Sequence, residues 1–192
     1  LQPENIYAFE PNERLYFRLK RIFTNINIYP FALSDKNETA TFKIPIIKGK
    51  EFNSRGTLKV DYRENGEEKH VFQQVKVIKL DDWEELKNLK KIDFIKIDVE
   101  GNEMQTLRGA KNMIEKFHPT LMVEMEQRHH PEPLHQLISE IENWGYQPYF
   151  LNRKTFELEN LGEDLIANLS QNFIDSKETY INNIIFIPKN HK

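Results

Sequence analysis

The sequence predicts an α/β protein with a mainly parallel sheet and helices on both of its faces. Short apolar runs of the length of buried strands alternate with segments whose apolar residues recur at helical spacing. This alternation is typical of parallel sheets, because parallel neighbours are usually joined by a crossover helix. Residues 38–80 depart from it, since polar and apolar residues alternate one by one there, and they predict a β-hairpin insertion.

The first elements are expected in the order strand, helix, strand. The apolar run at 5–10 stops at a proline and predicts a buried strand, and the helical spacing between 15 and 26 predicts the helix. Residues 27–33 predict the second strand, which ends in a polar turn. Within the insertion, polar turns are expected at 48–50 and 65–66.

The second half carries the strongest strand prediction. Residues 92–99 form an apolar run that predicts a buried strand, followed by a turn at Gly101 into a helix. An amphipathic pattern over 134–144 predicts another helix, which ends at Gly145 because glycine favours the left-handed cap. Further strands are predicted at 119–125, 146–151 and 181–187.

The composition excludes several classes of protein. The 192 residues match the usual size of one domain, so residues 1–192 are expected to form a single one. Without cysteine there are no disulfides, thiolate zinc sites or cysteine nucleophiles. A net charge of −3 does not gather a polyanion, so no nucleic-acid partner is expected. No apolar run approaches the roughly 18 to 20 residues that span a bilayer, so no membrane span is expected. A cytoplasmic location is taken as the default, and no oligomeric state is predicted.

Polar residues that close the predicted strands are the candidates for function. In open parallel sheets, ligands bind at the carboxyl ends of the strands. Four places qualify, and they are Glu10, the stretch 32–35, Asp98 with Glu100, and Glu124. Each of the four places contains an acidic residue, so the candidate functional groups are carboxylates at one edge of the predicted sheet.

Glu10 suits a nucleoside ligand. A carboxylate offers two oxygens, which can accept from both hydroxyls of a ribose. A simpler interpretation is that the positive end of the following helix favours an acid at this position. The position alone favours the simpler interpretation.

Asp98 and Glu100 stand two residues apart, so both side chains point to one side if the strand continues. Paired carboxylates can bind a cation, orient a substrate hydroxyl or accept its proton. The alternative is that one of them caps the next helix or faces water. Gly101 indicates a close approach of a ligand or of neighbouring backbone. Two acids are too few to establish a magnesium site, so no metal is predicted.

Several of these segments resemble, in order and spacing, the FkbM family of S-adenosylmethionine-dependent methyltransferases. The most specific is the string DFIKIDVEGNE at 93–103. The others are IYAFEPN at 6–12, ALSD at 32–35, LDD at 80–82, Leu107, Gly109-Ala110, Pro119 and Glu124. The likeness is strong from Ile6 to about Glu124 and looser as far as Pro188.

The resemblance implies a Rossmann-like class I methyltransferase sheet. It implies an enzyme that transfers a methyl group from S-adenosylmethionine to a hydroxyl of a small molecule or carbohydrate. By the resemblance, Glu10 holds the ribose, and Asp98 lies near the sulfonium and the acceptor. It also implies that Ala32, Leu33 and Ser34 line the adenine pocket.

The resemblance leaves the catalytic base less defined. Asp98 is the first candidate for the group that takes the hydroxyl proton, and Glu100 and Glu124 are implied at the edge of the site. His129 and His130 are second candidates, because they follow the strand predicted at 119–125. Consecutive histidines before a proline are more often loop residues, so they are assigned no role.

One part of the family's fold is expected to be missing from this sequence. Such enzymes hold the methionine end of the cofactor against a glycine-rich turn after the first strand, about 20 residues before the ribose acid. Here the first glycine is Gly49. The first strand and its glycine-rich loop are therefore expected to be absent, with that strand belonging between the strands predicted at 5–10 and 92–99.

Two explanations of this expectation remain open. The first is that the chain is a fragment of an active enzyme. The alternative is a non-catalytic binding or structural relative that has lost cofactor binding. A dinucleotide-dependent enzyme needs the same glycine turn, and the string at 93–103 argues against it.

Overall fold

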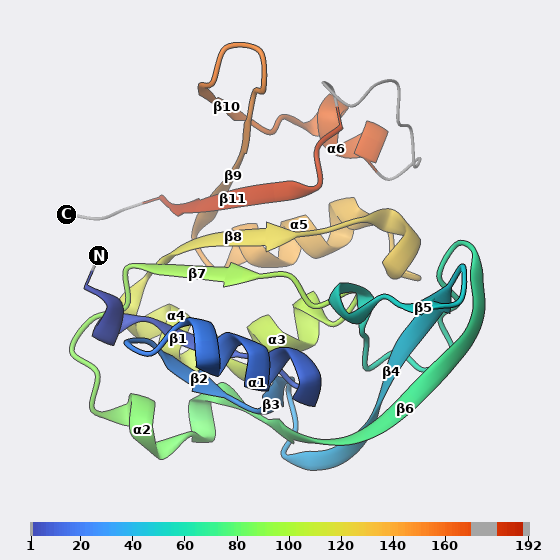
Figure 1. Cartoon of the computed structure of the whole chain (residues 1–192). Helices are drawn as coiled ribbons and strands as arrows, with labels where there is room; N and C mark the ends of the chain where they lie inside the picture. The colour runs from blue at the N-terminus through green and yellow to red at the C-terminus, as the bar shows by residue number, and fades with distance from the viewer. Residues whose placement is uncertain (1, 170–179, 190–192) are drawn as a thin grey trace. The chain divides into compact units, whose positions relative to one another are not determined.

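The computed structural model describes residues 2–169 and 180–189. The chain divides into two compact units, coloured along the sequence in Figure 1. The first unit comprises Leu1–Lys87 and Gln105–Ala110, and the second comprises Asn88–Met104 and Lys111–Lys192. Each unit has its own sheets and is described by itself. The single domain expected over 1–192 stays a prediction.

The first unit begins with the predicted order of strand, helix and strand. β1 (Tyr7–Phe9) leads into α1 (Glu13–Ile22), and β2 (Asn27–Tyr29) then pairs with β1 in parallel. Asn12 starts the helix, because its buried side chain accepts hydrogen bonds from two amides of the first turn. The sequence signal for a strand that stops at a helix start is thereby confirmed.

The single strand predicted at 27–33 is two strands. Pro30 separates β2 from β3 (Phe31–Leu33), because proline has no amide to continue a ladder. β3 pairs in parallel with β6 (Glu67–Ile78), whereas β2 pairs with β1, so the two halves belong to different sheets.

The hairpin insertion predicted at 38–80 is present as a long curved strand pair (Figure 1). β4 (Glu38–Ile47) pairs antiparallel with β6, and β5 (Lys50–Glu51) adds to the outer edge of β4. The predicted turns contain Gly49 and Gly66, with φ angles of 69° and 77° that favour glycine. The core of this sheet consists of Ala32, Phe42, Ile44, Val75 and Val77.

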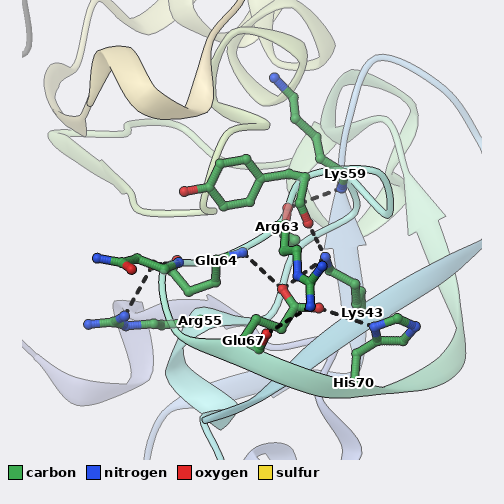
Figure 2. A network of polar contacts seen from close by, with 10 residues as sticks. Lys43, Arg55, Lys59, Arg63, Glu64, Glu67 and His70 are labelled. Carbon is green, nitrogen blue, oxygen red and sulfur yellow. Dashed lines mark hydrogen bonds and ion pairs between the residues drawn. The ribbon is translucent and has the colours of Figure 1, made fainter.

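A buried network of charges holds the connection between β5 and β6 (Figure 2). Lys43 of β4 and Glu67 of β6 are each only 3% exposed, and Lys43 Nζ lies 3.2 Å from Glu67 Oε2. Lys43 also donates to the carbonyl of Tyr62. Glu67 accepts from the amide of Glu64 at 2.8 Å and lies 3.1 Å from His70 Nδ1. The connection is therefore tied to the strands by an ion pair and its hydrogen bonds. α2 (Glu84–Lys87) follows the hairpin.

The second unit contains a five-stranded sheet in the order β10-β9-β11-β8-β7 (Figure 1). The strands are β7 (Phe94–Ile97), β8 (Thr120–Glu124), β9 (Tyr146–Leu151), β10 (Leu158–Asn160) and β11 (Asn183–Pro188). Among these described strands only β7 and β8 are parallel. The prediction of a mainly parallel sheet is therefore wrong for this unit. The reason is that β11 returns between β9 and β8 and runs against both of them.

β7 is an edge strand and is only partly buried. The side chain of Phe94 is 54% exposed, and Lys96 is also exposed. The prediction of a buried strand at 92–99 is wrong in this respect, since only Ile97 of β7 is fully buried. No described strand pairs with the outer edge of β7. β1 is likewise paired on one side only among the described strands. The placement of a further strand between these two stays a prediction.

The helices of the second unit follow the predicted pattern with two differences: the single helix predicted after Gly101 is two helices, and one later helix is an addition. α3 (Glu103–Gly109), which continues into the first unit, and α4 (Lys111–Phe117) follow β7; α5 (Leu134–Asn143) precedes β9. α5 buries its apolar face and packs against β9. The sequence patterns did not reveal β10 or α6 (Glu163–Leu169), and helices on both sheet faces stay a prediction. Within the described residues, no helix has the length and apolar character needed to cross a bilayer.

Candidate functional site

Glu10 closes β1 in the first unit, at the predicted position. Its amide donates to the carbonyl of Tyr29 at 3.0 Å, and its Oε1 accepts from the amide of Asn12 at 2.8 Å. Burial raises the pKa of Glu10 above its ordinary value, and the Asn12 amide acts in the opposite direction. Among the described residues no donor reaches Oε2. One carboxylate oxygen thus supports the start of α1, and the other is available for a ligand hydroxyl.

The stretch at 32–34 is packed closely in the same unit. Ala32 is 5% exposed and belongs to the apolar core, while Ser34 is 8% exposed. Thr106 Oγ1 donates to the carbonyl of Leu33 at 3.0 Å. A Cβ atom on Gly109 would lie 1.9 Å from the Ser34 carbonyl oxygen, so glycine is required for this approach. The adenine pocket stays a prediction, and of the three side chains Leu33 is the one that strand alternation directs away from the core.

Asp98 and Glu124 are brought together in the second unit, at the carboxyl ends of β7 and β8. The two strands are parallel, and Ile97 pairs with Val123, so the next residue of each strand is an acid. Asp98 lies close enough to Glu124 for its charge to raise the pKa of the Glu124 carboxyl. Lys96 Nζ lies 3.1 Å from Asp98 Oδ2 and 3.9 Å from Glu124 Oε2. The arrangement is a carboxyl pair with a lysine beside it.

The carboxyl pair holds a proton near neutral pH. Burial, and then the charge and hydrogen bond of Asp98, raise the pKa of Glu124 to about 7, although Lys96 and Asn182 act to lower it. Asn182 Nδ2 donates to Glu124 Oε1 at 2.7 Å. The Asp98 side chain is 47% exposed and that of Glu124 is 28% exposed. Two adjacent carboxyl groups, one of them well exposed, form an arrangement that can accept a proton from a substrate hydroxyl.

We predict that the free energy of unfolding falls as the pH rises from 5 to 8, and that the Glu124→Gln variant loses part of this dependence. The folded pKa of about 7 lies above the ordinary value of 4.5, so between these pH values the folded state keeps a proton that the unfolded state has released. The full shift corresponds to at most roughly 3 kcal/mol, and solvent reduces it. Urea unfolding of both proteins at four pH values measures the difference, and identical slopes would contradict the raised pKa.

Glu100 is not aligned with Asp98 as a continued strand would require. β7 ends at Ile97, and Glu100 and Gly101 have φ angles of 50° and 100°. The expectation that both acids lie on one side of the strand therefore loses its basis, because the backbone turns through the left-handed region. Glu100 Oε2 instead lies 3.4 Å from Nε2 of His129.

The side chains of His129 and His130 are buried. The interpretation of the two histidines as loop residues did not predict this burial. His129 ends a 3₁₀ helix that begins at Gln127, and the side chains of the two histidines are 5% and 3% exposed. His130 Nε2 lies 3.0 Å from Oε2 of Glu103, a side chain that is 2% exposed. The sequence signal that could have found these pairs is two histidines after one strand and two acids, at 100 and 103, after its neighbour.

Two other partners of the carboxyl pair were not predicted. Lys96 precedes Asp98 by two residues, a spacing that places both side chains on one side of the strand and could have identified it. Asn182 lies 58 residues from Glu124 in the chain, and only the pairing of β11 with β8 brings it close. No local sequence pattern indicates that contact.

Comparisons with known proteins agree with the resemblance. The family model for the methyltransferase FkbM domain matches residues 3–148. The fold is similar to the crystal structure of the methyltransferase FkbM from Methylobacillus flagellatus KT, with a TM-score of 0.51 and 15% sequence identity over 95% of this chain. This chain spans 36% of the length of that protein. No curated protein matches the sequence. Because the domain match covers far more than half of the 192 residues, the chain belongs to the FkbM methyltransferase domain family.

Proposed function

We propose that the protein is an S-adenosylmethionine-dependent O-methyltransferase that acts in the cytoplasm on a hydroxyl of a small molecule or carbohydrate. The observation that carries the proposal is the Asp98–Glu124 carboxyl pair at the ends of adjacent parallel strands, in a chain of the FkbM family. A methyl group that moves from sulfonium to a hydroxyl oxygen leaves a proton to be removed. The Asp98–Glu124 pair can accept that proton.

Each residue has a defined part in this proposal. The cofactor, when bound, supplies the methyl group from its sulfonium. Asp98 accepts the proton of the acceptor hydroxyl, because its side chain is the more exposed member of the pair, at 47% against 28% for Glu124. Glu124 lies beside Asp98 at the end of the neighbouring parallel strand and, when protonated, would stabilise its carboxylate. Lys96 balances the negative charge.

The cofactor's nucleoside is assigned to the first unit. The second oxygen of Glu10 is available for a ribose hydroxyl, and its burial strengthens such a bond. Leu33 offers an apolar side chain for the adenine ring, beside the backbone of Ala32 and Ser34. These groups fit a nucleoside. The methionine end of the cofactor has no glycine turn among the residues before Gly49.

A non-catalytic binding or structural relative, which has lost cofactor binding, is the second candidate. In such a protein the hairpin of β4 and β6 would serve partner contacts. The two candidates differ in one measurable property. Only the enzyme binds the methyl donor.

We expect calorimetric titration with S-adenosylmethionine to separate them. Two forms are compared, residues 1–192 and the longest form that the parent reading frame encodes. We expect little heat from the first and saturable binding by the second. Glu10→Gln in the longer form is expected to raise the Kd by about tenfold or more, the worth of a hydrogen bond to a charged group.

The control for this titration is Glu13→Gln, which changes an exposed acid three residues away in the first turn of α1. It is expected to leave the Kd unchanged. Absence of binding by the longer form would favour the non-catalytic candidate. Tight binding by residues 1–192 alone would show that no further glycine turn is needed.

A further inference from the structure

The turn after β7 is held in an unusual conformation. Glu100 has a φ of 50° and Gly101 follows with 100°, so two consecutive residues are left-handed. For a residue with a side chain this conformation costs about 1 to 2 kcal/mol, and it persists only when the surroundings enforce it. These residues follow Asp98 by two and three positions, so the turn adjoins the proposed base.

A buried contact between Glu103 and His130 joins the turn to the segment after β8. Glu103 Oε1 accepts from the amide of Gly101 at 2.8 Å, and Glu103 Oε2 lies 3.0 Å from Nε2 of His130. Both side chains are almost completely buried, at 2% and 3% exposure. Glu103 therefore fixes one arrangement of the turn, because any other arrangement breaks the hydrogen bond between its buried side chain and the Gly101 amide.

A second pair reaches the strained residue itself. His129 Nε2 lies 3.4 Å from Oε2 of Glu100. The segment that carries the histidines is also fixed, since the Gln127 side chain donates to the carbonyls of His130 and Glu132 at 3.0 Å each. The same side chain accepts from the amide at the start of α5 at 3.0 Å.

The two pairs connect the segments that carry the carboxyl pair. The acids at 100 and 103 follow Asp98 in the chain, and the histidines at 129 and 130 follow Glu124. Asp98 and Glu124 themselves touch only at the ends of their strands, where β7 has no outer neighbour among the described strands. The side-chain contacts just beyond both strand ends can therefore keep Asp98 and Glu124 together.

We infer that Glu103 and His130 are positioning residues, which clamp the turn at 98–101 to the segment after β8 so that Asp98 stays against Glu124. Glu100 and His129 form the outer half of this clamp. This inference deepens the proposed function, and the catalytic role of the clamp rests on that proposed function. The geometry of the clamp does not depend on any ligand.

The test measures a property of the carboxyl pair itself. The pKa of Glu124 is measured by carbon-13 NMR of its carboxyl group in residues 1–192. In the His130→Leu variant we expect it to fall from about 7 by about one unit or more, because Asp98 moves away and its like charge no longer raises the pKa. His130→Gln keeps a polar partner for Glu103 and is expected to stay close to the original value. His135→Leu, which changes an exposed histidine of α5, is the matched control and is expected to change nothing.

A glycine rescue distinguishes a clamp from a general loss of stability. If the clamp serves to enforce the left-handed turn, Glu100→Gly should restore part of the Glu124 pKa shift in the His130→Leu background even though it removes the contact with His129, since glycine adopts this conformation without a steric penalty. The double variant also keeps the test decisive if His130→Leu alone does not fold. Failure of the rescue, or an unchanged Glu124 pKa in folded His130→Leu, would overturn the inference.

Turnover in the longest encoded form separates this inference from the proposed function. If the clamp acts as inferred, His130→Leu lowers kcat by about tenfold or more, while the Kd for the cofactor changes little. A lowered Glu124 pKa with unchanged kcat would support the clamp and remove the catalytic role of the carboxyl pair. An unchanged pKa with lowered kcat would remove the clamp and leave the proposed function standing.

Discussion

The Asp98→Asn variant is expected to lower kcat by about a hundredfold to ten-thousandfold, the usual contribution of a positioned base. An amide has nearly the shape of the carboxylate but does not accept the proton of the acceptor hydroxyl. Asp98 is the accessible member of a carboxyl pair whose other member, Glu124, has a pKa of about 7. The effect is therefore expected on turnover at saturating cofactor, measured by methyl transfer from labelled S-adenosylmethionine in the longest encoded form.

Glu10→Gln is the matched comparison, because it makes the same change of acid to amide in the other unit. It is expected to raise the Kd for the cofactor and to leave kcat at saturation nearly unchanged, since the ribose contact is the same in the ground state and the transition state. The opposite pattern, with Asp98 affecting the Kd and Glu10 affecting kcat, would exchange the two assignments. Equal kcat in both variants and the original protein would exclude Asp98 as the base.

The sequence predicted most elements where the local signal was strong. One-by-one alternation over 38–80 corresponds to β4 and β6, and the positions of Gly49 and Gly66 identified both turns. The helix that ends at Gly145 was also predicted correctly, because an amphipathic stripe and a left-handed cap are local features. These signals depend on residues close together in the chain.

The errors concern pairing between distant segments. The apolar run at 92–99 indicates a buried strand, yet only one described neighbour pairs with β7, and no local pattern reports how many neighbours a strand has. Likewise the run at 181–187 predicts a strand but not its direction, and β11 lies antiparallel to both β8 and β9.

The candidate site shows the same division. Asp98 and Glu124 were identified because acids at strand ends are visible in the sequence, and the parallel register of their strands brings them together. The pairing of Glu103 with His130 was not predicted, because the turn beyond β7 leaves the strand direction at Glu100. A left-handed residue that is not glycine has no sequence signature.

Lys43→Met is expected to lower the free energy of unfolding by roughly 3 to 5 kcal/mol, the cost of removing one partner of a buried ion pair. Glu67 is only 3% exposed and would lose its ion-pair partner, the lysine 3.2 Å away. Burial alone raises the pKa of Glu67, but the hydrogen bonds from Glu64, Lys43 and His70 together hold it below its ordinary value. The stability that this carboxylate contributes is present above the unfolded pKa and is lost as the pH falls. Urea unfolding at pH 7 measures the loss.

The double variant with Lys43→Met and Glu67→Gln tests whether the loss of stability comes from the buried Glu67 carboxylate that no longer has its lysine partner. With both charges removed, the desolvation cost of Glu67 disappears, so most of the stability is expected to return. The surface control is Lys87→Met, which breaks the exposed pair with Glu84 on α2 and is expected to cost about 0 to 1 kcal/mol. If the double variant is as unstable as Lys43→Met, the lysine acts through its packing and its bond to the Tyr62 carbonyl, and the ion pair in Figure 2 is not what holds the connection between β5 and β6.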